Sequence, residues 1–394
     1  MPSKRFAILF AAFISALASG SHPASAAPID YDRLDQRLNR LAEDPGIVGL
    51  AVGVIEKGEI TFARGYGETR IGGMPVTADT VFRWASLSKG VASSLTARLE
   101  AQGALSLSDK VAGFETSLRL PGGAERDATL ENILSHRLGI IPNAYDTTLE
   151  DGRDPVEIRR SLGKLKAVCP IGDCHSYQNV AFDTVSEVVE NVAQSSYGQA
   201  LKTLLFKPLG MTNASIGRDS LQNAASWAEP HRYARGAKAA KRRKVKEAYY
   251  RVPAAGGVNG SIRDLALFAR AQMGLVPEVL PQAQLDNLHS PRVYTRREQS
   301  RLSGRYGGHI RDARYALAWR VYKYSAEGYR VVGHRGAVDG YRSLILFDPA
   351  LDTGVVVLWN SNSRKPTAIQ LEVMDMAYGL PARDWLQLDQ KASR

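Results

Sequence analysis

Long hydrophobic runs are absent from this chain of 394 residues once its first 26 residues are passed. The apolar run from Phe6 to Leu17 follows two basic residues and is too short to cross a bilayer comfortably. It leads into Ala24-Ser25-Ala26, the small-x-small pattern at which signal peptidase cleaves. We therefore expect residues 1–26 to be a signal peptide and residues 27–394 to form the mature protein, periplasmic or secreted.

Cysteine is equally scarce, with Cys169 and Cys174 as the two copies in the whole chain. A structural zinc site needs four ligands, and only His175 stands beside this pair, so the sequence predicts no metal site. An even number of cysteines in an exported protein favours a disulfide. We therefore expect Cys169 and Cys174 to be bonded to each other and to close a tight loop.

Acidic residues are the scarcer charged type, and the formal net charge is +11. Residues 232–251 carry nine lysines and arginines but a single acid, Glu247. Nucleic acid is a poor partner for an exported protein, so we expect none. Two interpretations stay open for residues 232–251: a solvated surface loop, or a patch that binds anionic cell-envelope polymers or lipid head groups. The sequence leaves the oligomeric state undetermined.

Strand-like runs occupy the two ends of the mature chain and helical periodicity occupies its middle. A hairpin is expected over Val48–Ile55 and Glu59–Gly65. Residues from about 105 to 290 are mostly helical in pattern. Further strands are expected at Tyr315–Tyr322, Tyr329–Val332, Tyr341–Phe347 and Gly354–Leu358. This order predicts an α+β fold, with an antiparallel sheet built from the N- and C-terminal segments, flanked by helices, and a helical inserted region.

The stretch Ser86-Leu87-Ser88-Lys89 opens a helix-like run that continues to Gly103. Residues three apart share one face of a helix, so Lys89 is expected one turn above the hydroxyl of Ser86. A serine hydroxyl becomes a nucleophile only when a neighbouring group takes its proton. Ser-x-x-Lys therefore predicts an activated serine, although the pattern alone also occurs at ordinary helix starts.

Two further stretches follow in order: Tyr177-Gln178-Asn179 before a helix, and His334-Arg335-Gly336 at the end of a strand. The ordered set resembles the serine β-lactamase and penicillin-binding protein superfamily, in particular the class C β-lactamase-like branch with its D-Ala-D-Ala carboxypeptidases, D-aminopeptidases and esterases. The resemblance extends over nearly the whole mature chain. It is also carried by Phe82 to Ser86, Gly103 to Val111, Ile133 to Gly139, Pro208 to Met211, Ala255 to Gly257 and Asp348-Pro349.

The resemblance implies a role for each residue. Ser86 would be the nucleophile, and Lys89 with Tyr177 would share its proton as a coupled acid/base pair. Asn179 would hold Lys89 and bind the substrate amide. The backbone N–H groups of Ser86 and Ala337 would form the oxyanion hole, next to Gly336. His334 would line the site opposite Tyr177, and no metal or organic cofactor is implied.

One departure from the family pattern bears on the substrate. Class C β-lactamases usually carry Lys-Thr-Gly as the third element, and this chain carries His-Arg-Gly. His334 is mostly neutral at pH 7, and Arg335 should point to the other face of its strand. We therefore expect an exported serine hydrolase that acts through an acyl-enzyme on a cell-wall peptide, amide or ester, or slowly on a β-lactam. A non-turnover penicillin-binding receptor or envelope-binding module, and a true class C-type β-lactamase, are the alternatives.

Overall fold

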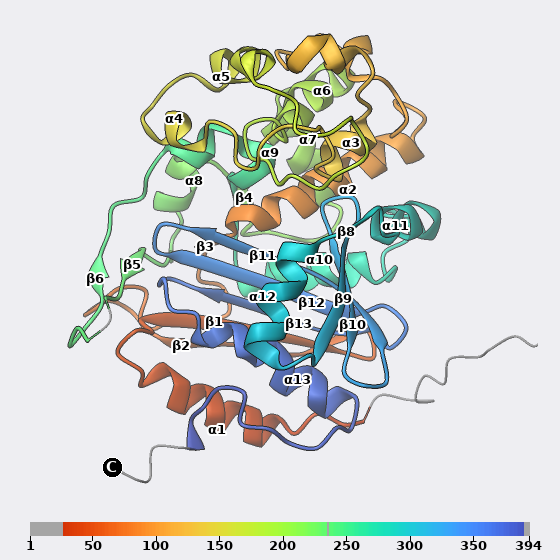
Figure 1. Cartoon of the computed structure of the whole chain (residues 1–394). Helices are drawn as coiled ribbons and strands as arrows, with labels where there is room; N and C mark the ends of the chain where they lie inside the picture. Colours follow the sequence, from red (N-terminus) through yellow and green to blue (C-terminus); the bar gives the residue numbers. More distant parts are fainter. Residues whose placement is uncertain (1–26, 235, 390–394) are drawn as a thin grey trace, which may run out of the picture.

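The computed structural model describes residues 27–234 and 236–389, so the predicted signal peptide lies outside the described residues. An antiparallel sheet crosses the molecule in the order β2-β1-β13-β12-β11-β10-β9-β8 (Figure 1). Its strands are β1 (Gly49–Glu56), β2 (Glu59–Gly67), β8 (Val293–Tyr294), β9 (Ile310–Tyr315), β10 (Arg320–Tyr324), β11 (Tyr329–Val338), β12 (Tyr341–Asp348) and β13 (Thr353–Trp359). The predicted α+β fold, with a sheet built from both ends of the chain, is confirmed.

Helices cover both faces of this sheet. On one face lie α1 (Tyr31–Ala42), α12 (Arg296–Tyr306) and α13 (Ile369–Ala377), whose apolar side chains pack in one core with the strands. On the other lie α2 (Ser88–Ala101) and α10 (Ile262–Gln272), in a larger core that continues into the helical region at the top of Figure 1. The central strands β1 and β13 are buried along almost their whole length because both faces are covered.

The helical region contains short elements joined by long loops. Its helices are α3 (Leu130–Leu134), α4 (Asp146–Glu150), α5 (Pro155–Ser161), α6 (Thr184–Ala193), α7 (Tyr197–Leu201), α8 (Arg218–Gln222), α9 (Pro253–Gly256) and α11 (Gln282–His289). A small sheet lies within it, in which β7 (Val258–Gly260) pairs with β3 (Phe82–Arg83) and β4 (Ser215–Ile216). The basic stretch, residues 232–251, takes part in a hairpin of β5 (His231–Arg232) and β6 (Lys241–Arg242), called the basic hairpin below.

The predicted strand over Tyr315–Tyr322 is wrong in its centre. The chain leaves β9 at Tyr315 and re-enters the sheet at Arg320, and the four residues between them form a tight connection. The amide of Ala316 donates to the carbonyl of Trp319 at 2.8 Å, and Ala318 has a left-handed φ of 64°. The indole of Trp319 is buried against Phe268 and Phe347, and this packing outweighs the strand-like pattern of the sequence.

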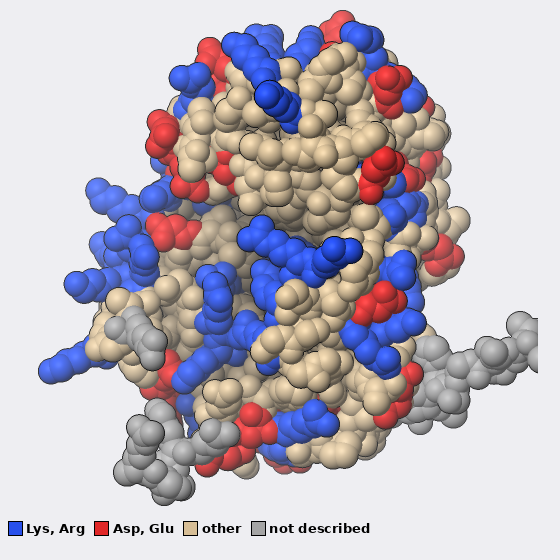
Figure 2. All heavy atoms as spheres, in the orientation of Figure 1, with Lys and Arg blue, Asp and Glu red and all other residues tan. Residues whose placement is uncertain are grey.

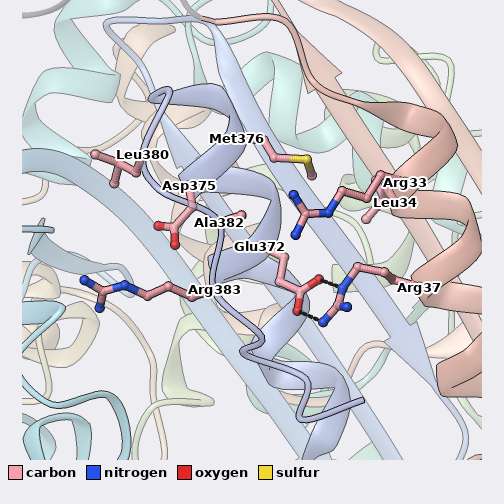
Figure 3. Close-up of a pocket in the computed structure, with 9 residues that line it drawn as sticks. All are labelled: Arg33, Leu34, Arg37, Glu372, Asp375, Met376, Leu380, Ala382 and Arg383. Carbon is pink, nitrogen blue, oxygen red and sulfur yellow. Dashed lines mark hydrogen bonds and ion pairs between the residues drawn. The ribbon is translucent and has the colours of Figure 1, made fainter. Parts of the chain in front are cut away.

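The first and last helices are joined by a buried ion pair. Arg37 of α1 donates to both carboxylate oxygens of Glu372 of α13, at 2.5 and 2.6 Å (Figure 3). A bidentate pair of this kind also fixes the orientation of α1 relative to α13. The cavity of about 60 Å³ beside it is lined by α1, α13 and the chain that follows, and it contains no candidate nucleophile. We therefore assign it a structural role.

Candidate active site

Ser86 lies on a strained turn at the entrance to α2. The turn Ala85–Leu87 is a short 3₁₀ helix, so α2 itself begins at Ser88, two residues later than the sequence pattern predicts. Ala85 has a φ of 50°, which is uncommon for a residue with a side chain and is typical of functional sites. Trp84, fully buried, anchors the turn by donating from Nε1 to the carbonyl of Gly260 at 3.1 Å.

Ser88, the competing hydroxyl, has a different role. Its side chain is fully buried, and its Oγ accepts a hydrogen bond from the amide of Val258 in β7 at 3.0 Å. Ser86 is half-buried and lines a cavity. The two hydroxyls therefore differ in access, and Ser86 is the one that a substrate can reach.

Lys89 lies in the interior with its ammonium group held from two sides. Its Nζ donates to Oδ1 of Asn179 at 2.7 Å and to the carbonyl of Ala255 at 3.0 Å. It also lies 4.7 Å from the ring centroid of Tyr177. None of the described residues forms an ion pair with it. A buried ammonium that is held only by neutral acceptors and an aromatic face is well placed for proton exchange with a neighbouring hydroxyl.

Asp146, which the sequence analysis missed, fixes the side chain of Asn179. Its Oδ2 accepts a hydrogen bond from Nδ2 of Asn179 at 2.6 Å. An ionised carboxylate can only accept hydrogen bonds, so Asp146 holds the Asn179 side chain with Nδ2 toward itself and Oδ1 toward Lys89. Burial raises the pKa of Asp146, and the hydrogen bond from Asn179 and the charge of Lys89 oppose that rise. No local motif marks this aspartate, because it reaches the site from a helix start that lies 33 residues before Asn179.

Tyr177 is held by its own backbone and by His136. The carbonyl of Tyr177 accepts from the amide of Asn143 at 2.8 Å, and the amide of Gln178 donates to Nδ1 of His136 at 3.2 Å. The His136 ring lies 4.3 Å from the Tyr177 ring. Burial lowers the pKa of His136 well below its ordinary value, which keeps the ring neutral and Nδ1 free to accept. His136 is therefore a packing residue that orients Tyr177.

The disulfide predicted between Cys169 and Cys174 is present. The loop that it closes is tied to the segment that carries His136. The amide of Val168 donates to the carbonyl of Gly139 at 2.8 Å, and the amide of Gly172 donates to the carbonyl of Arg137 at 2.9 Å. The loop ends three residues before Tyr177, so the bridge restrains the chain on which the phenol is carried.

Strand β11 brings the third motif directly against the serine turn. A Cβ placed on Gly336 would lie 2.3 Å from the carbonyl oxygen of Trp84 and 3.0 Å from the amide nitrogen of Ser86. Ser343 on β12 secures the same contact, since its Oγ donates to the carbonyl of Trp84 at 2.6 Å. Any side chain at position 336 would separate the strand from the turn, which explains the glycine.

His334 lies within the fold and close to Tyr177. Its ring centroid is 6.5 Å from that of Tyr177, and its Nε2 shares a hydrogen bond of 3.2 Å with the hydroxyl of Tyr315. Burial, followed by the charges of Arg320 and Lys89, lowers its pKa well below the ordinary histidine value. His334 is therefore neutral at pH 7, as the sequence predicts, and supplies no cation to the site.

One cavity joins these motifs. It measures about 290 Å³, and its lining includes Ser86, Tyr177, Gly336 and Ala337. The seven residues proposed from three distant stretches of sequence therefore meet at one place, through the cavity or through contacts behind it. Six cations that the sequence did not predict share this lining: Arg301, Arg305, Arg320, Arg335, Arg342 and Arg364.

Arg335 follows the predicted strand alternation, and it lines the cavity nevertheless. Its guanidinium pairs with Glu298 of α12, on the face of the sheet opposite to Ser86. However, β10 pairs with β11 only as far as Gly333, so residues 334–338 form a free strand edge. The cavity passes around that edge, and Arg335 lines it together with Ser86. Cations are therefore available beside the site although the motif lysine is absent.

The family profile described as Beta-lactamase matches residues 34–375, which is most of the described chain. The chain belongs to the beta-lactamase family. Curated proteins that it resembles are described as an esterase and as a D-alanyl-D-alanine-carboxypeptidase/endopeptidase.

Three curated relatives illustrate the range of the family. "Unguisins hydrolase ungD'" of Aspergillus campestris is 25% identical over 88% of this chain and 65% of its own length. "Esterase EstB" of Burkholderia gladioli is 30% identical over 51% of this chain and 53% of its own length. "D-alanyl-D-alanine-carboxypeptidase/endopeptidase AmpH" of Escherichia coli is 28% identical over 53% of this chain and 55% of its own length. In each case the match spans less than two thirds of the relative.

Solved structures support the same family fold. The octameric penicillin-binding protein homologue from Pyrococcus abyssi superposes with a TM-score of 0.78, over 89% of this chain and 78% of that one. Its sequence identity is 22%, so this likeness bears on the fold alone.

Proposed function

We propose that Ser86 is the acylated nucleophile of this hydrolase, and that Lys89 and Tyr177 together accept and return its proton. The observation that carries this proposal is the arrangement around Lys89. Its ammonium group is buried between Asn179 and the ring of Tyr177, and the Tyr177 side chain and Ser86 open into the same cavity. Burying a lysine ammonium group without a carboxylate partner is costly, so the fold holds Lys89 in this position against that cost.

The proposed reaction has two balanced steps. The Ser86 O–H bond breaks, its proton passes to the deprotonated form of the Lys89–Tyr177 pair, and Oγ bonds to the acyl carbon. The bond to the leaving group then breaks, and the leaving group takes the proton from the pair. Water repeats the sequence on the acyl-enzyme, giving a free acid and restoring the Ser86 hydroxyl. The amides of Ser86 and Ala337 would stabilise the oxyanion in both steps.

Asn179 has two proposed tasks, which its amide can divide between its two ends. Oδ1 holds the ammonium of Lys89, and the N–H of Nδ2 that is not donated to Asp146 would donate to the substrate amide. Asp146 is a positioning residue that acts through Asn179, because it fixes which end of the amide faces Lys89.

The proposed substrates are esters, amides or peptides, with D-amino-acid peptides of the cell wall as the leading class. Relatives described as an esterase and as a D-alanyl-D-alanine carboxypeptidase support this range. Two alternatives remain proposals of lower rank: a true class C-type β-lactamase, and a receptor that is acylated but does not turn over. Purified protein with a 4-nitrophenyl ester, a D-alanyl dipeptide and a chromogenic cephalosporin separates the three, because the receptor alone would form an adduct without product.

Ser86→Ala is the decisive variant, with Ser88→Ala as its matched control. Loss of the nucleophile should lower kcat by several orders of magnitude and abolish labelling by a fluorophosphonate probe. The Ser88 variant should still be labelled. Labelling of Ser86→Ala with the adduct on Ser88 would refute the assignment.

Export to the periplasm or medium is also proposed, on the basis of the pattern in residues 1–26 and the disulfide, which persists in oxidising compartments. In the described residues no helix is long and apolar enough to cross a membrane. Mass spectrometry of the mature N-terminus tests this directly, since cleavage after Ala26 should leave Ala27 first. An intact Met1 in protein recovered from the periplasm or the medium would contradict it.

The basic hairpin offers a proposed contact with anionic envelope polymers or lipid head groups. Part of its charge is already paired: Arg242 lies 3.3 Å from Glu229, and Arg243 lies 3.9 Å from Asp339. Lys241 and Lys244 have no ion-pair partner among the described residues and stand at the surface. Co-sedimentation with purified sacculi should fall steeply with salt and be lost when both lysines are replaced by serine. Equal sedimentation of the unmodified protein and the variant would contradict this proposal and favour a solvated surface loop.

A further inference from the structure

Six of the fourteen residues that line the cavity containing Ser86 are arginines. These arginines come from α12, β10, β11, β12 and the loop before α13. Figure 2 shows basic side chains gathered over and beside α12 on this face. Guanidinium groups carry five donors each and bind carboxylate or phosphate oxygens in pairs. Such a lining is unusual for a site that would process a neutral substrate.

Glu298 is the acid that holds half of these arginines in place. It pairs with Arg301 and Arg335, and its Oε2 lies 3.5 Å from Nη1 of Arg320. Burial raises the pKa of Glu298, but the charges of Arg320, Arg335 and Arg301 outweigh that effect, and its pKa falls to about 2. One carboxylate thus serves three guanidinium groups and leaves most of their charge unbalanced.

The other three arginines have no carboxylate partner in the part of the chain that the structure describes. Arg305 donates to the carbonyl of Arg364 at 2.6 Å, and Arg342 donates to the carbonyl of Asn362 at 3.2 Å. Burial lowers the pKa of Arg342, and the neighbouring charges of Arg364 and Arg305 lower it further. Like charges held this close repel one another, and an anion bound among them removes that cost.

The free edge of β11 connects these cations to the serine. Because β10 ends opposite Gly333, nothing in the sheet covers β11 from His334 to Val338 on that side. Ser86, Ala337 on this edge and the six arginines all line the same cavity. A substrate whose acyl group reaches Ser86 along this edge would carry its neighbouring substituents into the arginine-lined part.

We propose that the arginine-lined part of this cavity binds an anionic portion of the substrate, and that the natural substrate carries at least two negative charges, as carboxylates or phosphate, close to the scissile acyl bond. The identification of this ligand as substrate rests on the proposed function, whereas anion binding by the cavity does not. Citrate and pyrophosphate represent the two sources of charge, and comparing them distinguishes a carboxylate site from a phosphate site.

Binding is best measured in Ser86→Ala protein by titration calorimetry with citrate and with pyrophosphate. We expect one site per chain, weakened by salt. Removing Arg305 and Arg364 together, as Arg305→Gln/Arg364→Gln, should weaken binding by about tenfold or more, since a hydrogen bond to a charged group is worth more than a neutral one. Arg296→Gln is the matched control, because it lies nine residues from Arg305, about half a turn away around α12, and is exposed.

A kinetic experiment tests whether the proposed anion site is connected to Ser86. With 4-nitrophenyl butyrate and unmodified Ser86, citrate or pyrophosphate should raise KM without changing kcat, and the double variant should abolish that rise. Absence of binding by either anion, or equal weakening by Arg296→Gln, would overturn the proposal. Anion binding that is intact in a protein that hydrolyses no ester, amide or β-lactam would instead count against the proposed function and leave the anion site standing.

Discussion

Gly336→Ala tests whether close contact between β11 and the serine turn governs catalysis. An added Cβ would lie 2.2 Å from Oγ of Ser343 and 2.3 Å from the carbonyl oxygen of Trp84. The hydroxyl of Ser343 can rotate, but the carbonyl belongs to the backbone of the turn. Real Cβ atoms keep about 3.0 Å from such neighbours, so strand and turn must separate by about 0.7 Å.

That displacement acts on the groups proposed to stabilise the oxyanion. The amide of Ser86 lies on one side of the moved contact and the amide of Ala337 on the other, so their spacing should widen. A misplacement of this size can lower kcat by roughly a hundredfold. The crowding should also cost about 1–3 kcal/mol of folding stability.

Two further glycines separate these effects. Gly333→Ala, on the same strand, would bring a Cβ to 2.4 Å from the carbonyl oxygen of Ile345, so it should destabilise the sheet away from the serine. Gly113→Ala meets nothing within 4 Å and should change neither property. We expect kcat for 4-nitrophenyl butyrate to fall far more in Gly336→Ala than in Gly333→Ala at similar melting temperatures. A Gly336→Ala enzyme within twofold of the unmodified kcat would refute the reasoning.

Three other predictions follow from the same geometry. Lys89→Ala and Tyr177→Phe should each cripple acylation, and the double variant should be little worse in stopped-flow measurements; additive losses would mean that the residues do not share a proton path. Cys169→Ser should cost about 2–3 kcal/mol of stability and lower activity, and two free thiols in protein from the periplasm would contradict the bridge. Burial lowers the pKa of His136 and of His334, so folding stability should be fully present above about pH 6.5 and decline below it, by up to about 1.4 kcal/mol per group per pH unit. A melting temperature that rises when the pH is lowered from 7.5 to 5.5 would contradict the prediction that both histidine rings are buried and neutral.

Part of the arginine cluster in the cavity corresponds to a pattern that is visible in the sequence. Arg297, Arg301 and Arg305 recur every four residues, which is a basic stripe on one face of a helix. The stripe could not reveal its target, because Arg320, Arg342 and Arg364 join it only through the fold. The position of Asp146 had no such trace, since its role depends on a contact with Asn179 across the helical region.

Local sequence patterns were enough to predict the family, the fold class and the disulfide. The ordered motifs around Ser86, Tyr177 and His334 identified the family, because each is a short stretch that can be recognised without the fold. Terminal strands and central helices predicted the α+β sheet, since side-chain periodicity depends on neighbours in sequence. The short spacing of Cys169 and Cys174 predicted the disulfide for the same reason.

Only the tertiary structure decided what surrounds the serine. The end of β10 at Arg320 leaves the edge of β11 free, and this allows Arg335, on the far face of its strand, to share a cavity with Ser86. The left-handed turn at Ala85 and the break in the predicted strand at Ala318 arise from the packing of Trp84 and Trp319. These features depend on where strands end and which distant side chains meet, and long-range packing of that kind is not encoded in any local stretch of sequence.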